Sequence, residues 1–390
     1  IIIDIDSFKL INDSYGHEIG DKLLVEVSER LHSMNIDNSY IARMAGDDFA
    51  VMVWDYEDES RIIEIVTGLL NCIDGMAYIG DYSIVIETNI GVALYPKDGS
   101  SFDIIYKNAD TAKLQADEKR MKFAYYNEEM NDAVLERLNL QNSLRTALDK
   151  NEFVLYYQPQ YRAADKKIMG FEALVRWNSE SMGLVSPVKF IPVAEETRLI
   201  VRLGEWILEE AIKFIKKVHR LGHTDLIMSV NISNIQFIQK DFSEFVINLI
   251  KKYDLPPKSL ELEITESVMM GSMDNVINNI NRIRESGIRI ALDDFGTGYS
   301  SLNYLTKIPI NTLKIDKTFI DDVVLKTERS LLVEAIVNIA HGLGLSIVAE
   351  GVETEDQYVY LMKHKCERIQ GYFFSKPLPE DKVMDLITNH

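Results

Sequence analysis

The chain has 390 residues, of which 46% are hydrophobic and 26% are charged, and its formal net charge at pH 7 is -19. This composition is ordinary for a folded globular protein and excludes a disordered chain, while the length predicts two domains. The negative charge excludes a nucleic-acid polymer as a partner, because such binding needs Lys and Arg to neutralise phosphates.

Two features of the sequence bear on where the protein works. Cys72 and Cys366 are too few and too far apart for a disulfide framework, which predicts a reducing compartment and therefore the cytoplasm. No apolar run approaches the roughly 18 to 20 residues of a membrane-spanning helix. Because the chain begins abruptly inside an apolar run at residues 1–5, we expect a fragment of a longer protein, whose missing part could tether it to the inner face of the membrane.

The first 127 residues alternate strand and helix signals and predict a small α/β domain. Apolar runs predict strands at residues 1–5, 41–44, 49–54 and 84–92. Apolar residues at helical spacing predict helices at residues 20–34 and 103–119.

A helix is predicted to connect this domain to the rest of the chain at residues 128–150. The segment contains neither Gly nor Pro. Asn127 can cap the helix, and Glu128 and Glu129 suit its positive N-terminal dipole.

Residues 151–390 alternate eight strand signals with amphipathic helices such as 206–218. The strands are predicted at residues 153–157, 170–177, 227–231, 260–264, 289–293, 312–316, 346–350 and 368–372. This alternation predicts a (β/α)₈ TIM-like barrel.

Polar and charged residues recur near the ends of these predicted strands. They are Asn231, Glu261, Glu263, Asp293, Asp294, Lys314 and Glu350. Any one of them alone is more often a loop residue or a helix cap, but the carboxyl ends of barrel strands meet at one face. Hard oxygen ligands without His or Cys favour Mg²⁺ or Mn²⁺, so the spacing predicts a metal site.

Six motifs in the second part resemble the ordered motifs of the EAL family of cyclic di-GMP phosphodiesterases. They are GFEALVRW at 170–177, VNIS at 230–233, ELEITE at 261–266, DDFGTGYSSL at 293–302, LKID at 313–316 and AEGVE at 349–353. The resemblance implies an EAL-type (β/α)₈ barrel at residues 151–390 that hydrolyses cyclic di-GMP to linear pGpG with two Mg²⁺ or Mn²⁺ ions.

The resemblance also implies roles for individual residues. Its metal ligands are Glu172, Asn231, Glu263 and Asp293 for one ion, and Asp293, Asp294 and Glu350 for the other. Its substrate-binding positions are Gln158, Leu174, Arg176, Asp316, Glu353 and Gln370. Glu172, Asp293, Glu350 and Lys314 are the expected catalytic set. Lys314 is expected to accept a proton from the attacking water if the metals depress its pKa, and otherwise to orient that water as a cation. A salt bridge to the carboxylates is the alternative for this lysine.

A loop and a dimer are implied as well. Gly296 and Gly298 give the segment after the paired aspartates backbone freedom, and Glu266 resembles the carboxylate that holds this loop in the family. The family also implies a homodimer through the EAL domain.

Motifs in the first part resemble the GGDEF domain of diguanylate cyclases. They are DIDSFK at 4–9, ND at 12–13, GHEIGD at 16–21 and RMAGDDF at 43–49. The resemblance implies metal ligands at Asp4 and Asp47, and guanine contacts at Asn12 and Asp21, in a possible site for GTP.

This GGDEF domain, at residues 1–127 and truncated at its N-terminus, departs from its family. Ala45 replaces the first glycine of the signature, and Asp48 replaces the usual glutamate. Asp117 stands where the family has a lysine for the triphosphate, and the inhibitory product site is lost at Ile36 and Ser39. These departures predict a degenerate, regulatory domain with little or no cyclase activity, which could still bind GTP.

Three alternatives remain open from the sequence. The barrel could be a cyclic di-GMP receptor without activity, or the chain could be a bifunctional cyclase and phosphodiesterase. Residue chemistry alone also allows another phosphoester or a sugar as substrate.

Overall fold

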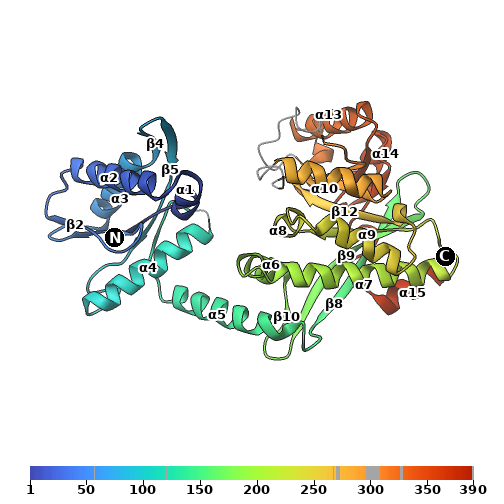
Figure 1. The fold of residues 1–390 in the computed structure, drawn as a ribbon, viewed down its shortest axis with the longest axis horizontal. Coiled ribbons are helices and arrows are strands. Elements are labelled where there is room, and N and C mark those ends of the chain that lie inside the picture. Colours follow the sequence, from blue (N-terminus) through green and yellow to red (C-terminus); the bar gives the residue numbers. More distant parts are fainter. Residues whose placement is uncertain are drawn as a thin grey trace. The chain divides into compact units, whose positions relative to one another are not determined.

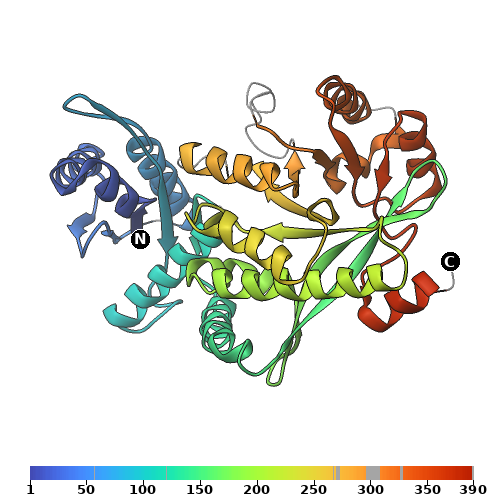
Figure 2. The same ribbon diagram turned by 45° about the vertical axis from the view of Figure 1, so that its right-hand side comes forward.

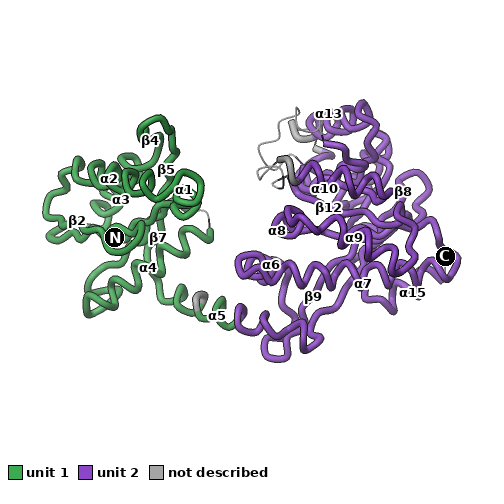
Figure 3. The backbone as a smooth tube through the Cα atoms, viewed as in Figure 1, with its two compact units in different colours: residues 1–139 green, residues 140–390 purple. Residues whose placement is uncertain are grey.

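The computed structural model describes residues 1–56, 58–119, 121–266, 268, 273–295, 308–325 and 328–388. The chain divides into two compact units, Ile1–Asn139 and Leu140–His390 (Figure 3). Helix α5, Glu129–Ala147, runs across the boundary between them.

The first unit is a mixed α/β domain built on a five-stranded sheet. The strand order is β2-β3-β1-β6-β7, with bounds Ser39–Arg43, Phe49–Val53, Ile2–Ile5, Thr88–Val92 and Phe123–Tyr125. A separate hairpin comprises β4 (Gly75–Ile79) and β5 (Tyr82–Ile86). The helices are α1 (Phe8–Tyr15), α2 (His17–Ser33), α3 (Glu59–Ile73) and α4 (Phe102–Glu118). Strand β1 lies in the middle and is antiparallel to both β3 and β6.

A close approach of helix α4 to strand β6 depends on a glycine. A Cβ atom built on Gly91 would lie 2.0 Å from the carbonyl oxygen of Ala109 and 2.3 Å from the backbone nitrogen of Lys113. Ser101 Oγ accepts from the backbone N–H of Ile104 and caps the start of α4. This packing brings the middle of α4 over the sheet beside β1.

The second unit is a barrel with helices on its outside (Figure 1). Its strands are β8 (Phe153–Arg162), β9 (Ile168–Ser179), β10 (Gly183–Val185), β11 (Ile227–Ile232), β12 (Leu260–Thr265), β13 (Arg289–Phe295), β14 (Thr312–Ile315), β15 (Ser346–Ala349), β16 (Arg368–Ile369) and β17 (Leu378–Pro379). The described helices are α6 (Pro187–Glu196), α7 (Ile200–Arg220), α8 (Asn234–Phe237), α9 (Phe242–Lys252), α10 (Met273–Glu285), α12 (Lys317–Ile320), α13 (Glu328–Gly342), α14 (Glu355–Lys363) and α15 (Glu380–Thr388), with single 3₁₀ turns at Pro257–Ser259 and Val323–Leu325.

Among the described residues, eight strands close the barrel in the order β9-β11-β12-β13-β14-β15-β16-β8, because β8 also pairs with β9. This confirms the predicted barrel. One strand departs from a regular (β/α)₈ arrangement, since β8 is antiparallel to both β9 and β16. Only five residues, 163–167, join β8 to β9. That connection is too short for the crossover that a parallel pair requires, so the two strands form a hairpin.

The long helix α7 shows why this outer layer is stable. Its apolar side chains recur at helical spacing and are buried on one face. The buried stripe includes Leu203, Ile207, Ala211, Phe214, Ile215 and Val218. The rings of Phe214 and Tyr157 on β8 are stacked with centroids 3.7 Å apart. Figure 2 shows α7 running along the outside of the barrel.

None of the helices in the described part of the chain combines the length and hydropathy that crossing a membrane requires.

Candidate active site

The charged residues predicted near the strand ends come together inside the second unit. Glu172 lies on β9, Glu263 on β12 and Asp293 on β13, while Glu350 follows the last residue of β15. Parallel neighbours place equivalent positions at the same height, and the strand pairing aligns Asn231 with Glu263. The carboxyl ends of the strands therefore gather these side chains at one end of the barrel.

The ammonium group of Lys314, on β14, lies at the centre of the four carboxylates. Its Nζ atom is 2.9 Å from Asp293 Oδ2 and 2.6 Å from Glu350 Oε1, and it donates a hydrogen bond to Glu263. Glu172 Oε1 is farther away, at 4.0 Å. The Lys314 side chain is only 1% exposed, so four buried carboxylates face a single positive charge.

This excess of negative charge changes the proton affinities of the cluster. Burial and the neighbouring carboxylates raise the pKa of Glu350 to about 8 and raise that of Glu263 well above its ordinary range, although Lys314 opposes both shifts. Burial and Asp293 likewise raise the pKa of Asp294. Burial lowers the pKa of Lys314, but the surrounding carboxylates outweigh it, and the net shift is well upward. In this arrangement Lys314 is a charged partner in salt bridges with the carboxylates. The role of proton acceptor, which depends on bound metals, stays a prediction.

Side-chain amides donate hydrogen bonds to Glu172. Asn231 Nδ2 donates to Glu172 Oε1 at 2.6 Å, and Gln370 Nε2 donates to Glu172 Oε2. Gln370 Nε2 also donates to Gln158 Oε1 at 3.0 Å, and Gln160 Nε2 donates to Gln370 Oε1 at 3.0 Å. The orientation of Glu172 is thus fixed by three strands.

The composition of the cluster fits hard divalent cations. Glu263 Oε1 is buried and has no hydrogen-bond partner among the described residues, and the available donors are carboxylate and amide oxygens, which Mg²⁺ and Mn²⁺ prefer. Within the described ranges, no three or more His, Cys, Asp or Glu side chains are arranged to hold a metal ion as they stand. The carboxylates close on Lys314 instead.

Comparison with known proteins identifies the barrel. The family model described as "EAL domain" matches residues 141–377. The chain belongs to this EAL domain family. The model described as "Diguanylate cyclase, GGDEF domain" matches residues 1–122, so the two domains occur in tandem. Both resemblances drawn from the motifs are confirmed.

Similar proteins have the same tandem region. The chain is 38% identical over 387 residues to the signaling protein YkoW of Bacillus subtilis, covering 99% of this chain and 48% of the relative. It is 37% identical over 385 residues to the bifunctional diguanylate cyclase/cyclic di-GMP phosphodiesterase MucR of Pseudomonas aeruginosa, covering 98% of this chain and 56% of MucR. The chain thus spans about half the length of these curated relatives. The solved structure "PaMucR Phosphodiesterase, c-di-GMP complex" matches with a TM-score of 0.61 and 40% identity, over 63% of this chain and 99% of that one.

The other predicted substrate-binding residues lie outside the central cluster of the EAL barrel. Asp316 caps α12, accepting from the Thr318 backbone N–H at 2.9 Å, and Glu353 forms an ion pair with Lys317. Arg176 donates to the Val175 carbonyl oxygen at 2.8 Å, and its guanidinium lies 5.6 Å from the ring centroid of Tyr156. Leu174 is half-buried opposite Tyr156 on β8.

The structure describes Asp294 and Glu266, which were predicted to act near Asp293. Asp294 has a left-handed backbone (φ 54°), and its backbone N–H donates to Asp293 Oδ1 at 3.0 Å. Glu266 is half-buried just after β12. The predicted Gly296 and Gly298 loop lies outside the described residues, so the suggested contact of Glu266 with it stays a prediction.

Glu261 does not lie at the level of the carboxylate cluster. Because side chains two residues apart on a strand face the same side, Glu261 points into the barrel like Glu263, but one layer nearer the start of β12. There it receives hydrogen bonds from Arg368 at 2.9 and 3.2 Å and from Arg289 at 3.0 Å. These contacts, Arg368 first, outweigh burial and lower its pKa to about 2. Including Glu261 among the converging strand ends was wrong, because strand periodicity fixes the face of a residue but not its depth.

Two buried residues were not foreseen from the sequence. Gln160, fully buried, connects the amide network to Arg368, and its spacing of two from Gln158 was the available signal. Lys113 was missed in the first unit. It follows Asp110 by one helical turn on α4, but its other partner, Asp48, is 65 residues away.

Lys113 occupies the acidic cluster of the GGDEF unit. Its Nζ atom lies 2.7 Å from Asp48 Oδ1, 2.9 Å from Asp110 Oδ1 and 4.0 Å from Asp4 Oδ1. Burial raises the pKa of Asp4 to about 7, because it exceeds the opposing effect of Lys113 and is reinforced by Asp47 and Asp48. The lysine thus lies 4.0 Å from Asp4, one of the two carboxylates to which the family resemblance assigns a metal.

The remaining predicted GTP-site residues lie in the β2–β3 turn and on helices α1 and α2. Asp47 is half-buried in the turn between β2 and β3. Asn12 lies on α1 so close to α2 that a Cβ on Gly20 would be 1.9 Å from its Oδ1 atom, and Asp21 is exposed on α2. Asp117 accepts a hydrogen bond from Asn89 Nδ2 at 3.2 Å, which places a carboxylate one turn of α4 beyond Lys113.

Proposed function

We propose that this chain hydrolyses cyclic di-GMP to linear pGpG with two Mg²⁺ or Mn²⁺ ions in the EAL barrel. The observation that carries the proposal is the convergence of four carboxylates from separate strands on the buried Lys314 ammonium. The cluster retains negative charge that divalent cations would neutralise. Membership of the EAL family supports the substrate, as do the name of the relative MucR and the solved complex of the MucR phosphodiesterase with cyclic di-GMP.

The residues of the cluster would divide the work between two ions. Glu172, Asn231, Glu263 and Asp293 would hold one, and Asp293, Asp294 and Glu350 the other. When bound, such a pair activates water as a nucleophile and stabilises the attacking and leaving oxygens of the phosphodiester. The amides of Asn231 and Gln370 orient Glu172 for this task.

Lys314 would act as an orienting cation. Its donors face carboxylates from β12, β13 and β15, so the ammonium holds these side chains at a common level. The salt bridges of Nζ with these carboxylates support a charged Lys314.

The substrate would extend from the cluster to the residues around it. Arg176 would contact a phosphate, since its guanidinium carries a fixed charge beside the aromatic face of Tyr156. Gln158 and Gln370 would line the pocket floor, and Leu174, Asp316 and Glu353 its periphery.

The direct test is turnover of cyclic di-GMP by the purified chain with Mg²⁺ or Mn²⁺, followed by chromatography of pGpG. Glu172→Gln should lower the rate more than about 100-fold, because even residues that only support metal ligands contribute 10- to 100-fold. Glu180→Gln, an exposed carboxylate beyond β9, is the matched control and should keep the wild-type rate. Binding of cyclic di-GMP by the wild type without any pGpG would establish the receptor alternative, and full activity of Glu172→Gln would contradict the assigned site.

We further propose that the GGDEF unit is regulatory and forms no cyclic di-GMP. Lys113 neutralises the acidic cluster, and Asp117 places a negative charge where the family has its triphosphate lysine. MucR is named as bifunctional, so the alternative has a precedent among relatives. Incubation with GTP and Mg²⁺ should give no cyclic di-GMP, even in a Glu172→Gln background that would let the product accumulate. Its accumulation there would refute this proposal.

GTP binding by the GGDEF unit, a homodimer through the EAL barrel and a cytoplasmic location also stand as proposals. Nucleotide titration and light scattering of the purified chain test the first two.

A further inference from the structure

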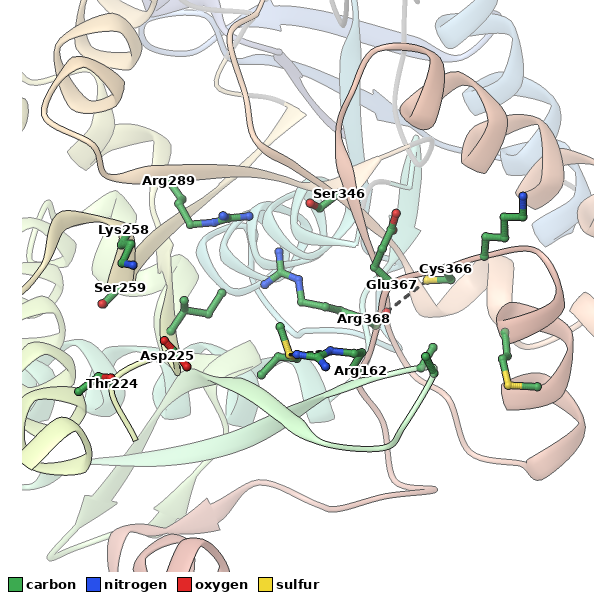
Figure 4. A pocket seen from close by; sticks show the side chains of 16 residues that line it. Arg162, Thr224, Asp225, Lys258, Ser259, Arg289, Ser346, Cys366, Glu367 and Arg368 are labelled. Carbon is green, nitrogen blue, oxygen red and sulfur yellow. Dashed lines mark hydrogen bonds between the residues drawn. The ribbon is translucent and has the colours of Figure 1, made fainter. Parts of the chain in front are cut away.

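The EAL barrel contains a pocket at the amino-terminal ends of its parallel strands. Its volume is about 720 Å³ (Figure 4). Ile227, Arg289, Ser346 and Arg368, which line it, are the first residues of β11, β13, β15 and β16. The carboxylate cluster gathers at the carboxyl ends of these strands, so the amino-terminal pocket is a separate cavity.

The charged side chains that line the amino-terminal pocket are mostly basic, in a chain whose net charge is -19. Five basic residues line it, namely Arg162, Lys258, Arg289, Lys365 and Arg368, against the acidic residues Asp225 and Glu367. Glu367 is engaged at the wall, accepting from the Ile347 backbone N–H at 3.0 Å and pairing with His341 at 2.9 Å. Arg162 is paired with Asp165 at 3.1 Å. The other four basic residues still exceed the acidic ones, so the lining has an excess of positive charge.

The buried groups at the floor of the pocket also carry more positive than negative charge. The fully buried Glu261 is shared by two guanidinium groups, those of Arg289 and Arg368, so one carboxylate faces two positive charges. Arg368 is 6% exposed and also donates to Gln160 and Thr312, whereas Arg289 is 32% exposed. Figure 4 shows the two guanidinium groups pointing toward one another inside the pocket.

We propose that the amino-terminal pocket is a binding site for a small phosphate-bearing anion. Guanidinium groups suit phosphate oxygens because several donors lie in one plane. The volume falls within the roughly 300 to 1,000 Å³ typical of small-ligand sites. The exposed lysines Lys258 and Lys365 add charge at the rim, where a second phosphate oxygen would lie. The inference does not rest on the proposed hydrolysis, because none of the cluster carboxylates takes part.

The same segments of the chain carry residues of the pocket and of the carboxylate cluster. Strand β12 carries Glu261 at the floor and Glu263 in the cluster, and Arg368 is two residues before Gln370, which donates to Glu172. An anion that draws Arg289 or Arg368 would thus act on strands that also position the cluster.

Titration calorimetry of the full chain with inorganic pyrophosphate tests the proposal. EDTA is present throughout, so that phosphate cannot bind through metal ions at the carboxylate cluster. We expect one saturable site per chain, which weakens as salt is added. The double variant Lys258→Met/Lys365→Met should bind about five- to tenfold more weakly, since exposed charges contribute modestly. The control Lys240→Met/Lys251→Met makes the same change of charge at exposed positions outside the pocket and should bind as the wild type does.

A third variant tests the role of the guanidinium. Arg289→Lys keeps the charge but loses the planar group, and it should also weaken binding while its thermal midpoint stays within a few degrees of wild type. A parallel titration with adenosine monophosphate distinguishes a nucleotide from a free phosphate ion as the ligand. Tighter binding than that of pyrophosphate assigns a nucleotide, and equal or weaker binding assigns the free ion. Absence of saturable binding up to about 5 mM pyrophosphate, or equal weakening by the two lysine pairs, would overturn the proposal.

Discussion

Each unit of this protein places a buried lysine among carboxylates, and the carboxylates of the two clusters differ in their access to water. The carboxylates around Lys113 in the GGDEF unit are 24 to 38% exposed. Those around Lys314 in the EAL barrel are 0 to 21% exposed, and Lys314 itself is 1% exposed. Water can replace a lost ammonium in the first cluster but much less in the second, where only another cation can compensate the charge.

The geometry of the two clusters explains this difference. Lys314 lies on a strand of a closed barrel, and its partners come from three other strands and from Glu350, the residue after β15. Lys113 comes from a helix laid on an open sheet, and one of its partners, Asp110, is on the same helix. The cluster around Lys314 is therefore a buried candidate metal site, whereas the cluster around Lys113 is a partly solvated group of salt bridges.

Removing the lysine from the barrel should have the largest effect. Lys314→Met leaves four carboxylates without their common cation, and we expect the metal-free protein to lose about 3 to 5 kcal/mol of unfolding free energy. Urea unfolding measures this loss in EDTA, and Mn²⁺ should restore part of it if the ions occupy the cluster. A variant as stable as wild type in EDTA would show that the ammonium does not hold the cluster together.

The corresponding change in the first unit should cost less. Lys113→Met leaves Asp4, Asp48 and Asp110 unpaired but partly hydrated, so we expect a loss of about 1 to 3 kcal/mol. Unfolding of the GGDEF unit can be followed by hydrogen exchange of helix α4 and strand β1. A loss equal to that of Lys314→Met would contradict the argument from exposure.

The smallest effect should come from a single partner of Lys113. Asp110→Asn removes the most exposed of the three carboxylates and leaves Asp48 at 2.7 Å from Nζ. Because Asp110 is partly hydrated and Lys113 keeps Asp48, we expect a loss of up to about 1 kcal/mol and only a slight shift in the midpoint of urea unfolding. A cost above that of Lys113→Met would mean that Asp110 has a structural role besides this ion pair.

Local patterns in the sequence predicted most of the barrel. Apolar runs marked its strands to within a few residues, except β8 and β9, which extend into a hairpin of 10 and 12 residues. The antiparallel direction of β8 was not predicted, because the alternation of strand and helix signals does not specify the direction of a strand. The site residues Glu172, Glu263, Asp293, Lys314 and Glu350 were named from spacing and motifs, and the fold brings them together.

The sequence by itself determined which residues face the barrel interior, since the period of two along a strand places Glu261 and Glu263 on one side. Only the tertiary structure decided their depth, their partners and thus their chemistry. Glu261 meets two arginines and has a lowered pKa, whereas Glu263 meets other carboxylates and has a raised one. The physical reason is that the charge around a buried group comes from strands distant in the chain, and their registers are fixed only when the barrel closes.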